Sequence, residues 1–234
     1  EQKRLYMVEN PLKLSRNGAY SMNKETIIDF IKKEFKEGKI RNEMFPMMTK
    51  FGIRDYSETV HTVGLNYITA IGRFVDGVTS LSECPVFPYS ERSHYGQMVA
   101  ESQASYEIKV NEVRPDSIWY SKEDNSPILI CEFERYEKNR RKDLKIKEKI
   151  QNLLLAYHQL GGNVPIILFV YWSYAGENPG DIEEYIAILN NGFKRSDGTY
   201  VRGINALKTT YLVYRCVASG NIDNLTLNQW VEVG

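Results

Sequence analysis

The sequence predicts an α/β protein with a mixed β-sheet flanked by helices. Apolar residues recur at helical spacing in residues 24–38 and 140–160, whereas segments rich in β-branched and aromatic residues follow one another between residues 105 and 136. The apolar run PIILFVYW, at 165–172, comes directly after the long helical segment. A strand, a long helix and a strand buried on both faces are typical of a crossover between parallel strands.

Four helices are expected along the chain. Asn23 can cap the first helix, and Gly38 can end it. Ser57 is taken as the cap of the second helix, which carries apolar residues on the face expected to lie against the sheet. The third helix is the clearest, because its apolar stripe is continuous and two glycines follow it. The expected ranges are 24–38, 57–74, 140–160 and 181–191.

The strands are expected in two groups. Three consecutive strands, 105–113, 114–121 and 127–136, are expected to pair in antiparallel fashion, with the turn-like sequence KEDNS between the last two. A buried strand at 164–174 follows the long helix. The sequence Ser196-Asp197-Gly198 indicates a hairpin turn before a final strand at 209–218.

A chain of 234 residues can bury the core of one domain of generous size. We expect residues 1–56 to be a helical N-terminal extension and residues 57–175 to be the core. Residues 176–234 are expected to complete the same domain with a helix and a β-hairpin.

Composition excludes several classes of protein. Lysine plus arginine and aspartate plus glutamate number 30 each, so any affinity for nucleic acid must come from a local patch. Three cysteines without a CxxC spacing fit a reduced, cytoplasmic protein and argue against a zinc site. Apolar runs are much shorter than the roughly 20 residues that cross a membrane, so we expect no membrane partner. Phosphate-loop, dinucleotide-binding and serine-hydrolase motifs are absent from the sequence.

Three acidic residues stand among apolar neighbours in the strands 114–121 and 127–136. Glu132 and Glu134 project from the same face, and Asp116 joins them if the two strand faces meet. Three carboxylates that converge in an apolar setting repel one another unless a cation neutralises them. Mg²⁺ or Mn²⁺ is the natural cation for such oxygen ligands. The alternative is an ordinary solvated strand face.

The order of these elements resembles that of the PD-(D/E)XK nuclease superfamily, whose fold is the restriction-endonuclease-like fold. The resemblance covers about residues 57–172. It depends on Pro115-Asp116, fifteen intervening residues and Glu132-Phe133-Glu134 in the appropriate strands, with a long helix after them. It implies an Mg²⁺- or Mn²⁺-dependent nuclease that hydrolyses phosphodiester bonds in DNA or RNA, with endonuclease action favoured and DNA the more expected substrate.

The resemblance also implies roles for individual residues. Asp116 and Glu132 match the metal-binding positions, and the backbone carbonyl of Phe133 would be a further ligand. Glu83 stands where many members carry an additional acidic ligand, although it also reads as a turn glutamate. His61 resembles the helix-borne histidine ligand of the viral cap-taking endonucleases; a packed or surface histidine is the alternative.

The sequence departs from the motif at Glu134, where the superfamily carries lysine. The resemblance implies that Glu134 positions or deprotonates water, and that a lysine on the following helix replaces the missing one. Among Lys142, Lys147 and Lys149, we expect Lys149 to take this role. An ordinary charged helix face is the alternative.

The sequence KNRRK, at 138–142, places positive charge at the start of a helix, where it opposes the helix dipole. An anionic partner such as a phosphate backbone explains this placement. Two other functions stay open: a nucleic-acid-binding module that has lost cleavage, and a protein-interaction domain; a homodimer is also compatible with the sequence. The expected nucleic-acid contacts are Lys138, Arg140, Arg141 and Lys142.

Overall fold

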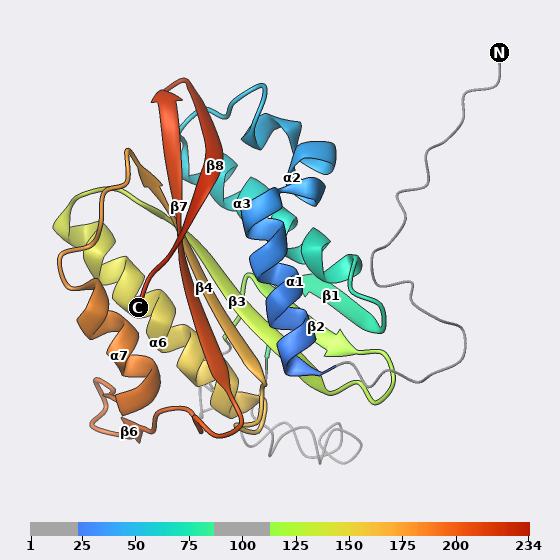
Figure 1. The fold of residues 1–234 in the computed structure, drawn as a ribbon. Helices are drawn as coiled ribbons and strands as arrows, with labels where there is room; N and C mark the ends of the chain where they lie inside the picture. Colours follow the sequence, from blue (N-terminus) through green and yellow to red (C-terminus); the bar gives the residue numbers. More distant parts are fainter. Residues whose placement is uncertain (1–22, 87–112) are drawn as a thin grey trace, which may run out of the picture.

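The computed structural model describes residues 23–86 and 113–234, which fold around a six-stranded mixed β-sheet (Figure 1). Strands follow one another across this sheet in the order β1-β2-β3-β4-β7-β8. The strands are β1 (Val78–Ser82), β2 (Ser117–Ser121), β3 (Pro127–Tyr136), β4 (Ile166–Tyr174), β7 (Thr210–Asn221) and β8 (Asn224–Glu232), and a separate ribbon joins β5 (Phe193–Lys194) to β6 (Tyr200–Val201).

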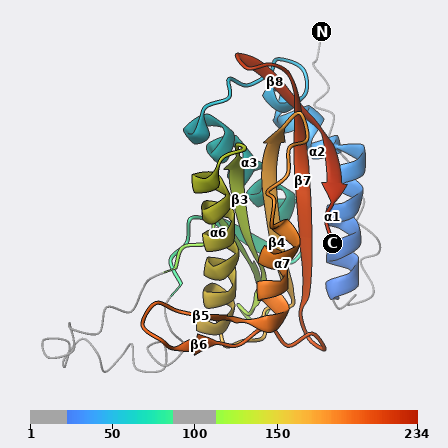
Figure 2. The same cartoon turned by 90° about the vertical axis from the view of Figure 1, so that its left-hand side faces the viewer.

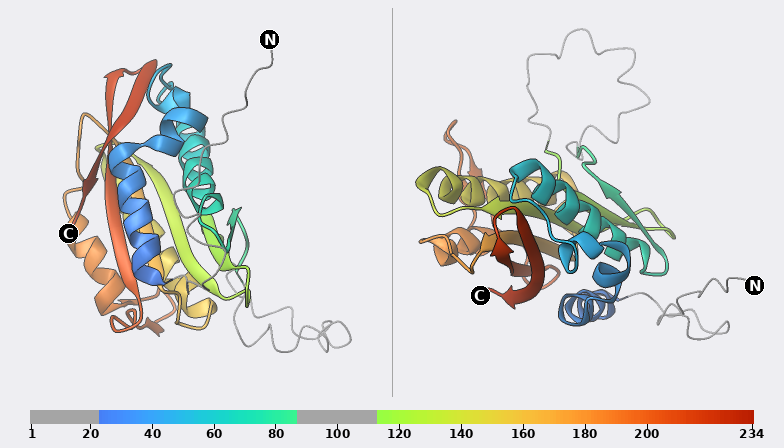
Figure 3. Two further views of the ribbon diagram at one scale, coloured as in Figure 1. Left: turned by 45° about the vertical axis from the view of Figure 1, so that its right-hand side comes forward. Right: turned by 90° about the horizontal axis from the view of Figure 1, so that it is seen from above.

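Helices cover both faces of the sheet, as the sequence predicted (Figure 2). The sheet separates the core into two clusters, one on each face. α6 and α7 pack on one face, and α1 and α3 pack on the other (Figure 3). A hydrogen bond from the Tyr67 hydroxyl to Glu34 joins α3 to α1. The helices are α1 (Lys24–Glu37), α2 (Lys39–Met44), η1 (Pro46–Met48), α3 (Ser57–Arg73), α6 (Arg140–Gln159) and α7 (Ile182–Asn191).

Two pairing directions agree with the sequence analysis. The pair β2–β3 is antiparallel, and β3 lies parallel to β4 after the crossover through α6. β1, which was not predicted, pairs with β2 in antiparallel fashion. β3 and β4 are central strands buried on both faces, which explains their nearly continuous apolar sequences. This arrangement holds the end of β3 next to the start of α6.

Several predicted boundaries are confirmed. Asn23 caps α1 through a 2.8 Å bond from the amide of Thr26, and Gly38, in the left-handed region, ends the helix. In the β5–β6 turn, the Asp197 side chain accepts a bond from the amide of Thr199. Ser57, however, is not the cap of α3: Tyr56 precedes the helix, and the Ser57 hydroxyl is instead 3.4 Å from Lys142 Nζ.

Two strands of the sheet were not predicted. β1 is short and contains two serines, so its pattern resembles a loop, and the predicted strand at 105–113 lies outside the described residues except for an isolated bridge between Val113 and Val86. The prediction that the strand at 209–218 ends the fold was wrong, because β7 continues to Asn221 and returns as β8.

Two glycines allow α3 to lie unusually close to the sheet. A Cβ atom on Gly64 would overlap the ring of Phe133 on β3, and one on Gly72 would lie 2.6 Å from the indole of Trp119 on β2. Both aromatic side chains are fully buried. The position of α3 is therefore determined by direct contact between its backbone and two aromatic rings.

Candidate active site

The three acidic residues are buried on the face of the sheet that α6 covers. The Ser117–Cys131 pairing of β2 with β3 brings Asp116 next to Glu132. Asp116 Oδ2 accepts a 2.7 Å bond from the backbone amide of Phe133, which fixes the carboxylate against β3. Side-chain exposure is 6% for Asp116, 1% for Glu132 and 2% for Glu134, so a solvated strand face is excluded.

Lys149 lies between two of these carboxylates. Its Nζ is 2.6 Å from Glu132 Oε2 and 3.5 Å from Asp116 Oδ1, and its side chain is 18% exposed. The lysine expected from the sequence thus lies against Asp116 and Glu132. Lys147, on the same helix, points elsewhere, and its ammonium lies 5.6 Å from the ring centre of Tyr185.

His61 holds Asp116 from the opposite side. Its Nε2 is 3.1 Å from Asp116 Oδ1, at the end of α3 that Gly64 brings close to β3. Burial alone would raise the pKa of Asp116, but the bond from His61, the charge of Lys149 and the Phe133 amide together lower it. Asp116 is therefore held in its charged form by its neighbours.

Glu132 behaves in the opposite way. Its burial and the neighbouring charge of Asp116 raise its pKa well above the usual range, although Lys149 acts against this shift. The ammonium of Lys149 loses stability through burial, yet the charges of Glu132 and Asp116 outweigh that effect and raise its pKa. Asp116 and Glu132 consequently share one cation, the ammonium of Lys149.

Glu134 is neutralised by two further lysines. Lys145 Nζ lies 3.0 Å from Glu134 Oε2, and Lys142 Nζ lies 3.5 Å from Oε1. Lys145 was not selected from the sequence. Its spacing, three residues after Lys142 and four before Lys149, places all three on one helix face, and this signal could have identified it.

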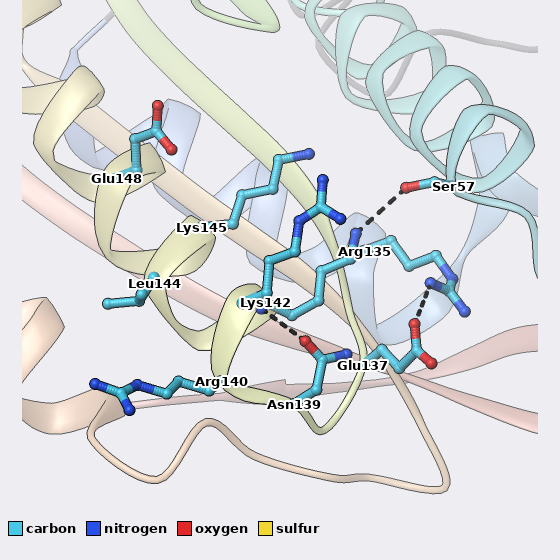
Figure 4. Close-up of a pocket in the computed structure, with 10 residues that line it drawn as sticks. Ser57, Arg135, Glu137, Asn139, Arg140, Lys142, Leu144, Lys145 and Glu148 are labelled. Atoms are coloured by element: carbon cyan, nitrogen blue, oxygen red, sulfur yellow. Dashed lines mark hydrogen bonds and ion pairs between the residues drawn. The ribbon is translucent and has the colours of Figure 1, made fainter.

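An open cleft of about 970 Å³ lies beside this cluster (Figure 4). It opens between the start of α3, where Ser57 lies, and the first turns of α6, and Lys142 reaches across it toward Ser57. Among the residues that the sequence assigned to nucleic acid, Lys138 is not part of the lining. The cleft is lined by Ser57, Arg135, Glu137, Asn139, Arg140, Arg141, Lys142, Leu144, Lys145 and Glu148.

Glu83 stays outside the cluster. It is exposed, adopts a positive φ of 48° after β1, and its backbone amide donates to the carbonyl of Asp116. In the described residues no contact joins its carboxylate to Asp116 or Glu132. The turn-glutamate alternative is the one that this geometry favours.

Asp116 and Glu132 are the residues of the cluster that could hold a metal ion. Among residues 23–86 and 113–234, no three or more histidine, cysteine, aspartate or glutamate side chains form a group that could hold one. Mg²⁺, however, usually keeps several waters and takes only one or two protein carboxylates. Asp116 and Glu132 already share the cation Lys149, so these two carboxylates fit such an ion in chemistry and in arrangement.

Fold and site together define a mixed α/β protein with a buried carboxylate–lysine cluster beside a basic cleft. No protein-family model, curated protein or solved structure matches the chain, so its function must be argued from this site. In the part of the chain that the structure describes, no helix is long and apolar enough to cross a membrane.

Proposed function

We propose that the chain is an Mg²⁺- or Mn²⁺-dependent nuclease with the restriction-endonuclease-like fold. The observation that carries this proposal is the meeting of Asp116 and Glu132 on the single ammonium of Lys149, beside a cleft lined by cations. Strand-borne carboxylates suit a divalent metal, and a cationic cleft suits a phosphate backbone. The order α3-β1-β2-β3-α6-β4 and the Pro115-Asp116 motif agree with the resemblance found in the sequence.

In this mechanism Asp116 and Glu132 would hold the metal ion, which would supply an activated water and positive charge against the phosphodiester. His61 and the amide of Phe133 keep Asp116 in one orientation. Lys149 supplies positive charge next to the reacting phosphate, and Glu134 accepts a proton from water, in the place where the superfamily carries lysine.

The test combines metal binding with cleavage. Wild type, Asp116→Asn and Glu132→Gln are titrated with Mn²⁺ by calorimetry and incubated with DNA and RNA, each single-stranded and double-stranded. We expect saturable Mn²⁺ binding and cleavage in the wild type and loss of both in each variant. Asp124→Asn is the control, because Asp124 lies in the exposed β2–β3 turn and should leave both unchanged. A folded wild type that binds no Mn²⁺ contradicts the proposal.

One observation favours a second candidate, a nucleic-acid-binding module without cleavage. Every carboxylate of the cluster already has a lysine as its ion-pair partner, so no metal is required to neutralise the acids. This candidate predicts that the protein binds nucleic acid equally well in EDTA and in Mn²⁺ and cleaves it in neither. The same titration therefore separates the two functions.

A further inference from the structure

Glu134 connects the interior of the protein to the cleft. Its carboxylate is almost fully buried, at 2% exposure, and in the described part of the chain its ion-pair partners are Lys142 and Lys145. Both lysines line the cleft, with side-chain exposures of 17% and 44%. A solute in the cleft can thus reach the two ammonium groups while the carboxylate behind them stays covered.

The other cations of the cleft are arranged differently. Arg135 is held by Asp55 at 2.6 and 2.7 Å and by Glu137 at 3.1 Å, so its guanidinium is already engaged. Arg140 and Arg141 make no ion pair within the described residues, and Arg140 extends outward along the rim (Figure 4). Among the cations that line the cleft, Lys142 and Lys145 are therefore the two that pair with a carboxylate of the cluster.

We propose that Lys142 and Lys145 exchange Glu134 for a phosphate group of nucleic acid when the substrate enters the cleft. Lysine suits this exchange, because its ammonium is a compact charge on a flexible stem and can turn between two anions. A phosphate accepts charge-assisted bonds from lysine as a carboxylate does, so it can take the place of Glu134 on the two ammonium groups. Binding would then free the Glu134 carboxylate at the moment when a substrate is present.

This inference depends on the binding of nucleic acid that the proposed function requires, but not on cleavage. In the free protein Glu134 competes with phosphate for the same two lysines. Removing its charge should strengthen binding, and by more than the removal of another acid in the same cleft. Glu148 supplies the matched control, since it is exposed, lines the cleft and makes no ion pair among the described residues.

The experiment measures the affinity for a fluorescein-labelled single-stranded oligonucleotide by anisotropy, in EDTA so that nothing is cleaved. We expect Glu134→Gln to bind roughly fivefold more tightly than wild type and Glu148→Gln to differ from it by less than about twofold. In a Lys142→Gln, Lys145→Gln background, Glu134→Gln should have no effect. Equal effects of the two acid substitutions, or an effect of Glu134→Gln that persists without the lysines, would overturn the exchange.

Circular dichroism verifies that each variant is folded. If Glu134→Gln does not fold, the Lys142→Gln, Lys145→Gln protein still tests the exchange. It should bind at least about tenfold more weakly than Lys122→Gln, Lys147→Gln, which removes equal charge outside the cleft. Equal affinity of these two proteins refutes the proposal. A wild type that binds no oligonucleotide refutes the nucleic-acid function itself, whereas binding without the Glu134 effect refutes the exchange alone.

Discussion

Replacing Lys149 with methionine tests the central ion pair of the site. The substitution leaves Glu132 and Asp116, at 1% and 6% exposure, without the ammonium that lies 2.6 and 3.5 Å from them. Removing one partner of a buried pair costs about 3–5 kcal/mol. We expect about 3 kcal/mol at pH 8, the lower end, because Lys149 is 18% exposed and Glu132 can take up a proton.

Urea unfolding followed by circular dichroism measures this cost. Lys147→Met is the matched control on the same helix, and its ammonium, over the ring of Tyr185, is worth about 0.5–1 kcal/mol. In a Glu132→Gln background the cost of Lys149→Met should fall to about 1 kcal/mol, because one buried charge is already gone. The reasoning is refuted if Lys149→Met and Lys147→Met cost the same, or if the double variant shows no coupling.

Three further predictions follow from packing and burial. Gly64→Ala should cost about 3 kcal/mol in urea unfolding, because its Cβ overlaps a buried ring, whereas Gly180→Ala, with nothing within 4 Å, should change stability by less than about 0.5 kcal/mol. The folded state raises the pKa of Glu132, so above pH 4.5, the ordinary pKa of this group, the folded protein keeps a proton that the unfolded chain releases. The contribution of Glu132 to the free energy of unfolding therefore falls as pH rises. Glu132→Gln lacks this loss, so its stability relative to wild type should increase from pH 5 to pH 8 in urea titrations; a constant difference contradicts the assignment. Burial raises the pKa of the Cys131 and Cys216 thiols, so intact-mass analysis after iodoacetamide treatment at pH 8 should find one modified cysteine, Cys84, in the folded protein and three after unfolding.

Much of the site could be predicted because its geometry is local. Alternation along β3 places Glu132 and Glu134 on one face, and a short turn brings the preceding strand beside them. Helical spacing on α6, which returns over the same strand, places Lys149 on a face with Lys142, and the structure brings Lys149 to Glu132. These relations depend on the period of each element, which the sequence displays directly.

The remaining features depend on contacts between distant parts of the chain. Gly64 lies close to Phe133 only because α3 packs across β3, and nothing in the helix sequence indicates that approach. β1 and β8 are edge strands with few apolar residues in alternation, so their pairing is determined by their neighbours rather than by their own pattern. The cleft likewise appears only when the starts of α3 and α6 are brought together.

The contact between Gly64 and Phe133 gives the two sides of the site different tolerances to sequence change. On the α3 side the constraint is volume, since any side chain larger than hydrogen at Gly64 meets the buried ring of Phe133, whatever its charge. On the α6 side the constraint is charge, since a neutral residue in place of Lys149 leaves Glu132 and Asp116 without their ammonium. Neutral drift in this protein is therefore expected to preserve a small residue on one helix and positive charge on the other.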